Sequence, residues 1–181
     1  IGCDFLGGQR AVFPQSGTHH VLVENCFWEQ DIRVFTTWDW TNLHHGTLEY
    51  YNGALLQAWG SLGMHIMRGC VAKNVFNGFR TKPTVYSEDS NIEVYNNTFI
   101  NVRDNSFEPE LWAWNIHFYH NKLFNSRKSF SIDGVKGGPL YVYGNIQYQE
   151  QNPILGPDVL GGVAQTISGV WKYITGPLTL P

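Results

Sequence analysis

Two glutamates, Glu108 and Glu110, lie two residues apart in the segment SFEPEL. Charged residues make up only 15% of the 181 residues, so neighbouring carboxylates are conspicuous. A pair of carboxylates can transfer protons in glycoside hydrolysis or can bind a hard cation such as calcium. On an extended segment, residues two apart lie on the same face. This segment is therefore the first candidate for chemistry.

The surroundings of the pair follow from an internal repeat. The segments NIEVYNNTF, NIHFYHNKL and PLYVYGNIQ begin at Asn91, Asn115 and Pro139, a constant step of 24 residues. Each alternates apolar and other residues, which is the period of a strand and not of a helix. Segments that begin at His20 and Met64 fit the same pattern. A unit of this length cannot bury its apolar side alone, so successive units must stack.

Stacking places equivalent residues of successive units above one another, about 4.8 Å apart. One expected column points into the core and contains Phe79, Phe107, Phe130 and Ile154. A second column forms a hydrogen-bonded ladder at a turn and contains Asn97, Asn121 and Asn145, with Gly69 at the asparagine position in an earlier unit. These columns predict an all-β chain folded as a right-handed parallel β-helix with rungs of about 24 residues, the handedness following the general preference for right-handed crossovers.

We expect residues 1–181 to form a single β-helix domain, in which residues 39–63 are a degenerate rung or a loop along a groove. The units at both ends of the numbering are incomplete. Solenoids cover their terminal turns with caps, and neither end offers one. The pattern therefore predicts a piece of a longer solenoid, or an assembly that covers the ends.

The same alignment predicts a charged outer face. If the phenylalanines point inward, Glu108 and Glu110 point outward. The equivalent residues are Arg80 and Lys82 one unit earlier and Asp133 one unit later. Arg80 should then lie beside Glu108, and Lys82 beside Glu110. A ladder of surface salt bridges, each contributing about 0–1 kcal/mol, is the structural alternative to a catalytic site.

Units of the form NIEVYNNTFINVRDNSFEPE, with asparagine at a turn and a later GGPLYVYGN, resemble the pectate-lyase-like superfamily of β-helix proteins. The resemblance covers nearly the whole chain at the level of the repeat, without a family catalytic signature. It implies a secreted enzyme that acts on an acidic or plant- or algal-type polysaccharide. The alternative is a non-catalytic β-helix, such as an adhesin, spike or surface-layer element.

The charged face fits two kinds of polysaccharide chemistry, and the sequence leaves both open. β-Elimination from a uronate needs a base, a cation that neutralises the carboxylate, and an acid. Arg80 or Lys82 could serve as base or acid, while Glu110 and Asp133 could hold calcium. A retaining glycosidase needs carboxylates about 5–5.5 Å apart and an inverting one about 6.5–9.5 Å. Glu110 with Asp133 suits the first, and Glu108 with Glu110 the second.

Aromatic residues near this face could stack on sugar rings, although packing against the solenoid is the structural alternative. An acidic residue at the edge of the face, Asp104, could also contact substrate. The expected substrate-binding residues are Trp38, Trp40, Tyr50, Trp59, Asp104 and Trp112.

A second outer column, from the first strand of each unit, contains two histidines that flank a carboxylate. Such a column could bind zinc or act as acid and base, although its spacing matches no zinc motif. Its members are His65, Glu93, His117 and Tyr141. The tyrosines 95, 119 and 143 are expected to form a stacked structural ladder.

The remaining features narrow the classes of partner. The net charge is −3 without a run of Lys or Arg, which argues against nucleic acid, and no apolar stretch is long enough to span a bilayer. The three cysteines occur in similar contexts (GCDF, NCFW, GCVA), which suggests equivalent places in the repeat. Asn96-Asn97-Thr98 has the pattern of a glycosylation site.

Overall fold

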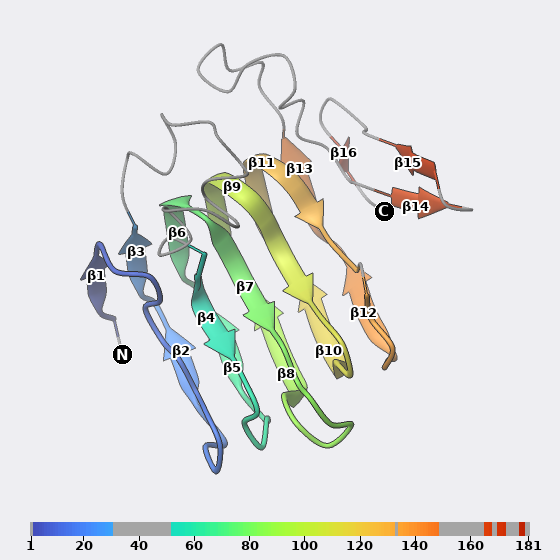
Figure 1. Cartoon of the computed structure of the whole chain (residues 1–181). Helices are drawn as coiled ribbons and strands as arrows, with labels where there is room; N and C mark the ends of the chain where they lie inside the picture. The colour runs from blue at the N-terminus through green and yellow to red at the C-terminus, as the bar shows by residue number, and fades with distance from the viewer. Residues whose placement is uncertain are drawn as a thin grey trace.

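The computed structural model describes residues 2–30, 52–132 and 134–148, together with the backbone of three short strands further along the chain. All the described secondary structure is strand, and most strands pair in parallel (Figure 1). The chain forms a β-solenoid of about five turns with rungs about 24 residues apart. This confirms the all-β solenoid that the repeat predicts.

Two parallel sheets form the walls of the solenoid. The five-stranded sheet contains β2 (Leu22–Glu24), β5 (Ile66–Arg68), β8 (Ser90–Tyr95), β10 (Trp114–Tyr119) and β12 (Leu140–Tyr143). The nine-stranded sheet contains β1 (Asp4–Leu6), β3 (Phe27–Glu29), β4 (Ala54–Ala58), β6 (Val71–Val75), β7 (Asn77–Thr81), β9 (Thr98–Pro109), β11 (Lys122–Phe130), β13 (Ile146–Tyr148) and β16 (Leu178–Thr179). Strand β16 is antiparallel to β13, and β14 (Gln165–Ile167) pairs antiparallel with β15 (Val170–Lys172).

The repeat sets the register of the later turns. Ile92 pairs with Ile116 and Ile116 with Leu140, so each step is 24 residues. The earlier steps are longer, because Ile66 pairs with Glu93 and Leu22 with Ile66. In β8 the alternation of buried and exposed side chains follows the strand period that the sequence predicts.

The inward column of phenylalanines is confirmed for three of its four members. Phe79 pairs with Phe107, and their rings stack with centroids 5.8 Å apart. Phe107 pairs with Phe130, whose ring lies edge-on at 6.5 Å. Phe118 of β10 lies 4.7 Å from Phe107 between ring centroids, so the core joins the two sheets. Ile154 lies outside the described residues.

The buried asparagine ladder is also confirmed. Asn121 donates its backbone N–H and its side-chain amide to Asn145 Oδ1, at 2.9 and 3.0 Å. Asn97 donates in the same way to Asn121. The expected place of Gly69 in this ladder is wrong. Cys70 takes it instead, because the Cys70 N–H donates to Asn97 Oδ1 at 2.9 Å.

Of the segment 39–63, the structure describes residues 52–63. These include β4, a buried strand in which Leu56 pairs with Phe79 and Gln57 with Arg80. This part of the segment is therefore a regular strand of the solenoid. The expectation of a loop before it concerns residues outside the described ranges and stays a prediction.

Candidate active site

Strands β7 and β9 place Arg80 beside Glu108, as the alignment predicts. The two residues are register partners, and Arg80 Nε lies 3.1 Å from Glu108 Oε2. Both follow an inward phenylalanine, so both side chains lie on the outer face of the nine-stranded sheet. Asn105 donates its side-chain amide to the other oxygen of Glu108 at 3.0 Å.

Glu110 lies between two cations. Its Oε1 accepts hydrogen bonds from Arg80 Nη2 at 2.6 Å and from Arg80 Nε at 3.1 Å. Its Oε2 lies 3.3 Å from Lys82 Nζ. Lys82 Nζ also lies 5.5 Å from the centre of the Trp59 ring. The pairs that the sequence predicts on this face therefore form one ionic cluster, which we define as Arg80, Lys82, Glu108 and Glu110.

The ionic cluster is graded in exposure, which corrects the expectation of a solvated ladder. The side chains of Arg80 and Glu108 are 8% and 11% exposed. Those of Glu110 and Lys82 are 19% and 34% exposed. The cluster thus runs from a nearly dry end at Glu108 to a half-exposed end at Lys82. Charges at the dry end interact more strongly than surface charges, and they are more costly to leave unpaired.

This grading changes the acid–base properties of the cluster. Burial raises the pKa of Glu108 to about 8, and the charges of Asp104 and Glu110 oppose the lowering effect of Arg80. The Glu108 carboxyl therefore keeps its proton to a higher pH than an exposed glutamate does. For Arg80, burial lowers the pKa, but Glu108 and Glu110 outweigh it and the net shift is upward. A guanidinium held in this way is a poor base, and the expected role of Arg80 in the reaction stays a prediction.

The two carboxylates lie close together. Glu108 Oε2 and Glu110 Oε1 are each 3.1 Å from Arg80 Nε, so they are no more than about 6 Å apart. A retaining pair, about 5–5.5 Å apart, is compatible with this upper limit, and the assignment of the pair as retaining or inverting stays a prediction.

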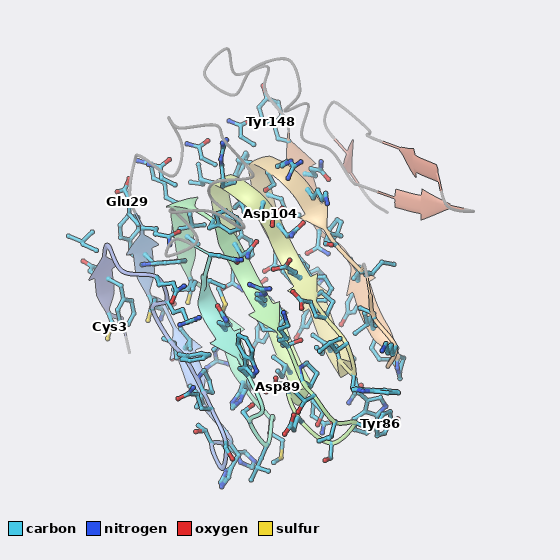
Figure 2. All side chains as sticks on the ribbon, viewed as in Figure 1. Cys3, Glu29, Tyr86, Asp89, Asp104 and Tyr148 are labelled. Atoms are coloured by element: carbon cyan, nitrogen blue, oxygen red, sulfur yellow. The ribbon has the colours of Figure 1, made fainter. Side chains whose placement is uncertain are left out.

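The other residues expected at the site fall into three groups. Asp104, which is labelled in Figure 2, is buried, with its side chain 4% exposed. Its Oδ1 lies 3.6 Å from Arg127 Nη1. Its charge acts on Arg80 and Glu108, and its expected contact with substrate stays a prediction. Trp59 and Trp112 are 38% and 37% exposed. Four residues lie outside the described ranges, and their roles stay predictions: Trp38, Trp40, Tyr50 and Asp133. The calcium site expected at Glu110 and Asp133 is untested for the same reason.

Two residues of the site were missed from the sequence. Asn52 accepts a hydrogen bond from Arg80 Nη1 at 2.7 Å. Gln57 is the register partner of Arg80 on β4 and is fully buried, and within the described part of the chain neither atom of its amide has a hydrogen-bond partner. The run ALLQA is apolar apart from Gln57, which is typical of a buried strand and is the signal that could have placed Gln57. The expectation of a degenerate rung or loop over residues 39–63 hid this strand.

The second outer column is partly wrong. Ile66, not His65, pairs with Glu93, so His65 belongs to the inward row and is fully buried. Glu93 accepts a hydrogen bond from the Tyr119 hydroxyl at 3.0 Å, and the His117 ring stacks on Tyr141 at 4.3 Å. Among the described residues, no group of three or more His, Cys, Asp or Glu side chains is arranged to hold a metal ion.

The tyrosines of the first strand do stack. The rings of Tyr95, Tyr119 and Tyr143 follow one another with centroids 4.9 Å apart and nearly parallel planes. Tyr119 is therefore stacked on both of its faces. This matches the structural ladder expected from the sequence.

His65 belongs to a buried hydrogen-bonded group with Ser61 and Asp89. Ser61 Oγ lies 2.8 Å from His65 Nε2 and donates to Asp89 Oδ1 at 2.6 Å. The Val21 N–H donates to His65 Nδ1 at 3.2 Å, so the ring proton is on Nε2. His65 therefore donates to the serine and cannot accept its proton. Despite its composition, this group is not a nucleophilic triad. Asp89 also lies well away from Asp104 (Figure 2).

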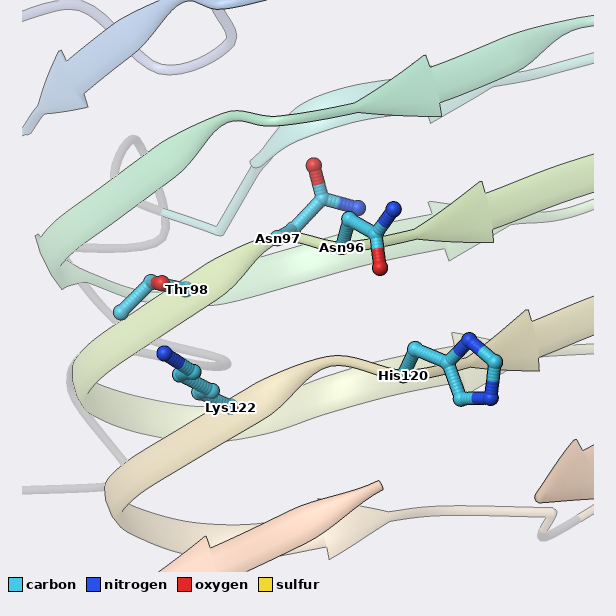
Figure 3. A pocket seen from close by; sticks show the side chains of 5 residues that line it. All are labelled: Asn96, Asn97, Thr98, His120 and Lys122. Carbon is cyan, nitrogen blue, oxygen red and sulfur yellow. The ribbon is translucent and has the colours of Figure 1, made fainter. Parts of the chain in front are cut away.

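A hollow of about 220 Å³ lies at the turns between β8 and β9 and between β10 and β11 (Figure 3). Its lining residues are Asn96, Asn97, Thr98, His120 and Lys122. It contains no carboxylate and lies apart from the ionic cluster. We therefore place the candidate active site at the cluster and not at this hollow.

Comparisons with protein-family models, with curated proteins and with solved structures give no match for this chain. Within the described ranges, no helix has the length and apolar character needed to cross a bilayer. The fold and the site together define a parallel β-solenoid with a buried ionic cluster on one outer face.

Proposed function

We propose that this protein is an extracellular polysaccharide-active β-helix enzyme, akin to the pectate-lyase-like superfamily, and that it hydrolyses an acidic glycan at the ionic cluster. The observation that carries the proposal is the pair formed by Glu108 and Glu110. Two carboxylates share one guanidinium contact, and their surroundings differ. Pairs of this kind supply the acid and the nucleophile of glycoside hydrolysis.

In the proposed reaction, Glu108 in its acid form protonates the glycosidic oxygen. Glu110 attacks the anomeric carbon and forms a glycosyl ester, and the aglycone leaves. Water, deprotonated by Glu108, then cleaves the ester and releases the sugar with retained configuration. Arg80 holds Glu110 in place for attack. Lys82 and Trp59, at the exposed end, are suited to the carboxylate and the ring face of a uronate residue.

Hydrolysis is favoured over β-elimination by the state of Arg80. Elimination would need a base close to the sugar, and Arg80 is held as a cation by both glutamates. Lys82 remains the candidate base for elimination. An assay that separates the two reactions therefore also tests the role of Lys82.

The test is a cleavage assay on a panel of acidic glycans, including polygalacturonate and alginate, with neutral glycans for comparison. Reducing ends report both reactions, and absorbance of an unsaturated uronate reports elimination alone. We expect reducing ends without that absorbance, and a loss of roughly 100-fold or more in Glu108→Gln and Glu110→Gln. Glu24→Gln is the matched control, because Glu24 also pairs with an arginine but on the other sheet. Full activity of Glu108→Gln, or no cleavage of any glycan, would contradict the proposal.

A non-catalytic β-helix is the second candidate function. It is favoured by the saturation of Arg80, all of whose guanidinium nitrogens contact protein side chains. An adhesin or surface element would need such a cluster only to hold adjacent turns together. Glycan binding without cleavage in the same panel would favour this function.

A further inference from the structure

The three cysteines, which the candidate active site does not use, lie in one column of the solenoid. The residues that follow them pair in register, Asp4 with Phe27 and Phe27 with Val71. Cys3, Cys26 and Cys70 are therefore stacked on successive turns, about one strand spacing of 4.8 Å apart. Figure 2 labels Cys3 beside β1, at the start of this column.

The column continues into the asparagine ladder, and sulfur takes the place of the amide oxygen. The Cys70 N–H donates to Asn97 Oδ1 at 2.9 Å, and one turn earlier the Cys26 N–H donates to Cys70 Sγ at 3.4 Å. Sulfur is a weak acceptor. At this place in the ladder a thiol therefore accepts a weaker hydrogen bond than an asparagine would. This points to a role for the thiol other than hydrogen bonding in the ladder.

Cys26 and Cys70 are neighbours in this column, and the Cys70 thiol lies against the Cys26 backbone N–H. They are 6% and 1% exposed. Cα atoms about 4.8 Å apart satisfy the range of about 4.4–6.8 Å found for disulfides. We propose that Cys26 and Cys70 are a redox modification site, a dithiol that a low-molecular-weight disulfide such as oxidised glutathione converts into a bridge between successive turns.

The chemistry balances as two thiol–disulfide exchanges. One protein thiolate attacks oxidised glutathione, forms a mixed disulfide and releases one reduced glutathione. The second protein thiol attacks the mixed disulfide and releases another. The protein loses two protons and two electrons, and one glutathione disulfide becomes two thiols. Burial raises the pKa of the Cys70 thiol to about 11, so Cys70 is a poor first nucleophile. Cys3 is exposed, so the mixed disulfide can also form there first. Cys26 then displaces glutathione from Cys3, and in a third exchange Cys70 attacks Cys26 and releases the Cys3 thiol, with the same net reaction.

The disulfide bridge would close a loop of the chain that contributes residues next to Arg80 of the candidate site. The loop that it closes, residues 26–70, contains Asn52 and Gln57, which lie beside Arg80. Closing a loop lowers the entropy of the unfolded chain. The oxidised protein should therefore melt at a higher temperature than the reduced protein. This inference does not depend on the proposed enzymatic activity.

The test uses the whole chain, purified with its thiols reduced and then incubated with oxidised glutathione. We expect thiol titration to show two thiols lost, peptide mapping by mass spectrometry to join Cys26 to Cys70, and the melting temperature to rise. Three remaining thiols, glutathione adducts without a bridge, or a bridge from Cys3 to Cys26 alone would each overturn the proposal.

Matched variants sharpen the test. Cys70→Asn restores the asparagine found at this place in the next three turns, so the ladder is kept while the thiol is removed. Its melting temperature should not respond to oxidised glutathione. Cys3→Ser should still form the bridge, although more slowly. If Cys70→Asn does not fold, the peptide map of Cys3→Ser decides alone.

Discussion

Each sheet carries an arginine–glutamate pair on its outer face, and the two pairs have the same length. Arg80 Nη2 lies 2.6 Å from Glu110 Oε1, and Arg68 Nη2 lies 2.6 Å from Glu24 Oε1. Their surroundings differ. The Arg80 and Glu110 side chains are 8% and 19% exposed, whereas those of Arg68 and Glu24 are 40% and 27% exposed. Distance alone therefore says little about what an ion pair does, and burial decides between a structural contact and a tuned chemical group.

The neighbours explain the difference. Arg68 bonds the Glu24 carboxylate, and it donates to the Tyr95 hydroxyl at 3.0 Å. Its side chain is exposed to solvent. Arg80 bonds Asn52 and Glu110 and lies 3.1 Å from the nearly dry Glu108. Burial raises the pKa of Glu108, the less exposed of the two carboxylates that share this guanidinium. On the other sheet, the partner of Arg68 is the more exposed Glu24.

The largest effect should come from removing the buried cation. Arg80→Met leaves Glu108 and Glu110 without their shared partner, and breaking a buried pair in this way costs about 3–5 kcal/mol. Arg68→Met removes the equivalent exposed cation and should leave stability nearly unchanged. Urea unfolding of both variants measures the difference. Equal losses in the two would show that burial does not separate the pairs.

A second effect concerns a buried histidine, His65, on the inner side of the sheet that carries Arg68 and Glu24. Burial lowers the pKa of His65 to about 4 from an ordinary value of 6.5. The folded state therefore favours the neutral ring. The stabilisation is present above pH 6.5 and is lost as the pH falls towards 4, by up to about 3 kcal/mol. The free energy of unfolding of the wild type should therefore decrease as the pH is lowered from 6.5 to 4.

The control for this prediction is another histidine of the same sheet. His65→Gln should flatten the acid limb of the stability curve, and His117→Gln should leave it as in the wild type. His117 is half-buried and stacks on Tyr141, so its ring remains in contact with water. A wild-type curve that stays level between pH 6.5 and pH 4 would refute the burial argument.

A smaller effect compares two neighbouring residues of one turn. Asn121 is fully buried and satisfies the Val94 carbonyl and Asn145 Oδ1. Asn121→Ala should cost about 1–3 kcal/mol, because these buried acceptors lose their donor. Lys122 is exposed, and Lys122→Ala should leave the denaturation midpoint almost where it is in the wild type. Similar midpoints for both variants would mean that the ladder contributes little.

The sequence predicted the fold because the repeat is regular where the columns are strongest. The constant step between Asn97, Asn121 and Asn145 set the register, and the register placed Arg80 beside Glu108. The prediction failed at His65, because that step is longer by three residues and moves the side chain to the inner row. A second hydrogen-bonded column, Asn74, Asn101 and Asn125, was also missed.

The character of the site was harder to predict than its position. Alternation along β9 shows which side chains leave the core, but not what covers them once outside. Glu108 points away from the core, but the residue is buried and only 8% exposed. Its burial depends on contacts between turns, among them Asn105 and Arg80, which a strand pattern does not encode. The sequence therefore gives the pairing on this face and leaves its acid–base properties open.

The most direct test of the account is the titration of Glu108 itself. Side-chain carboxyl signals in NMR can be followed with pH and assigned by their loss in Glu108→Gln. We predict a midpoint at about 8, far above the ordinary value of 4.5. Because the folded pKa is raised, the stability that Glu108 contributes is full below pH 4.5 and should be lost as the pH rises from 4.5 through 8. A midpoint at or below 4.5 would mean that Glu108 is an ordinary paired carboxylate, and it would contradict the assignment of Glu108 as the acid.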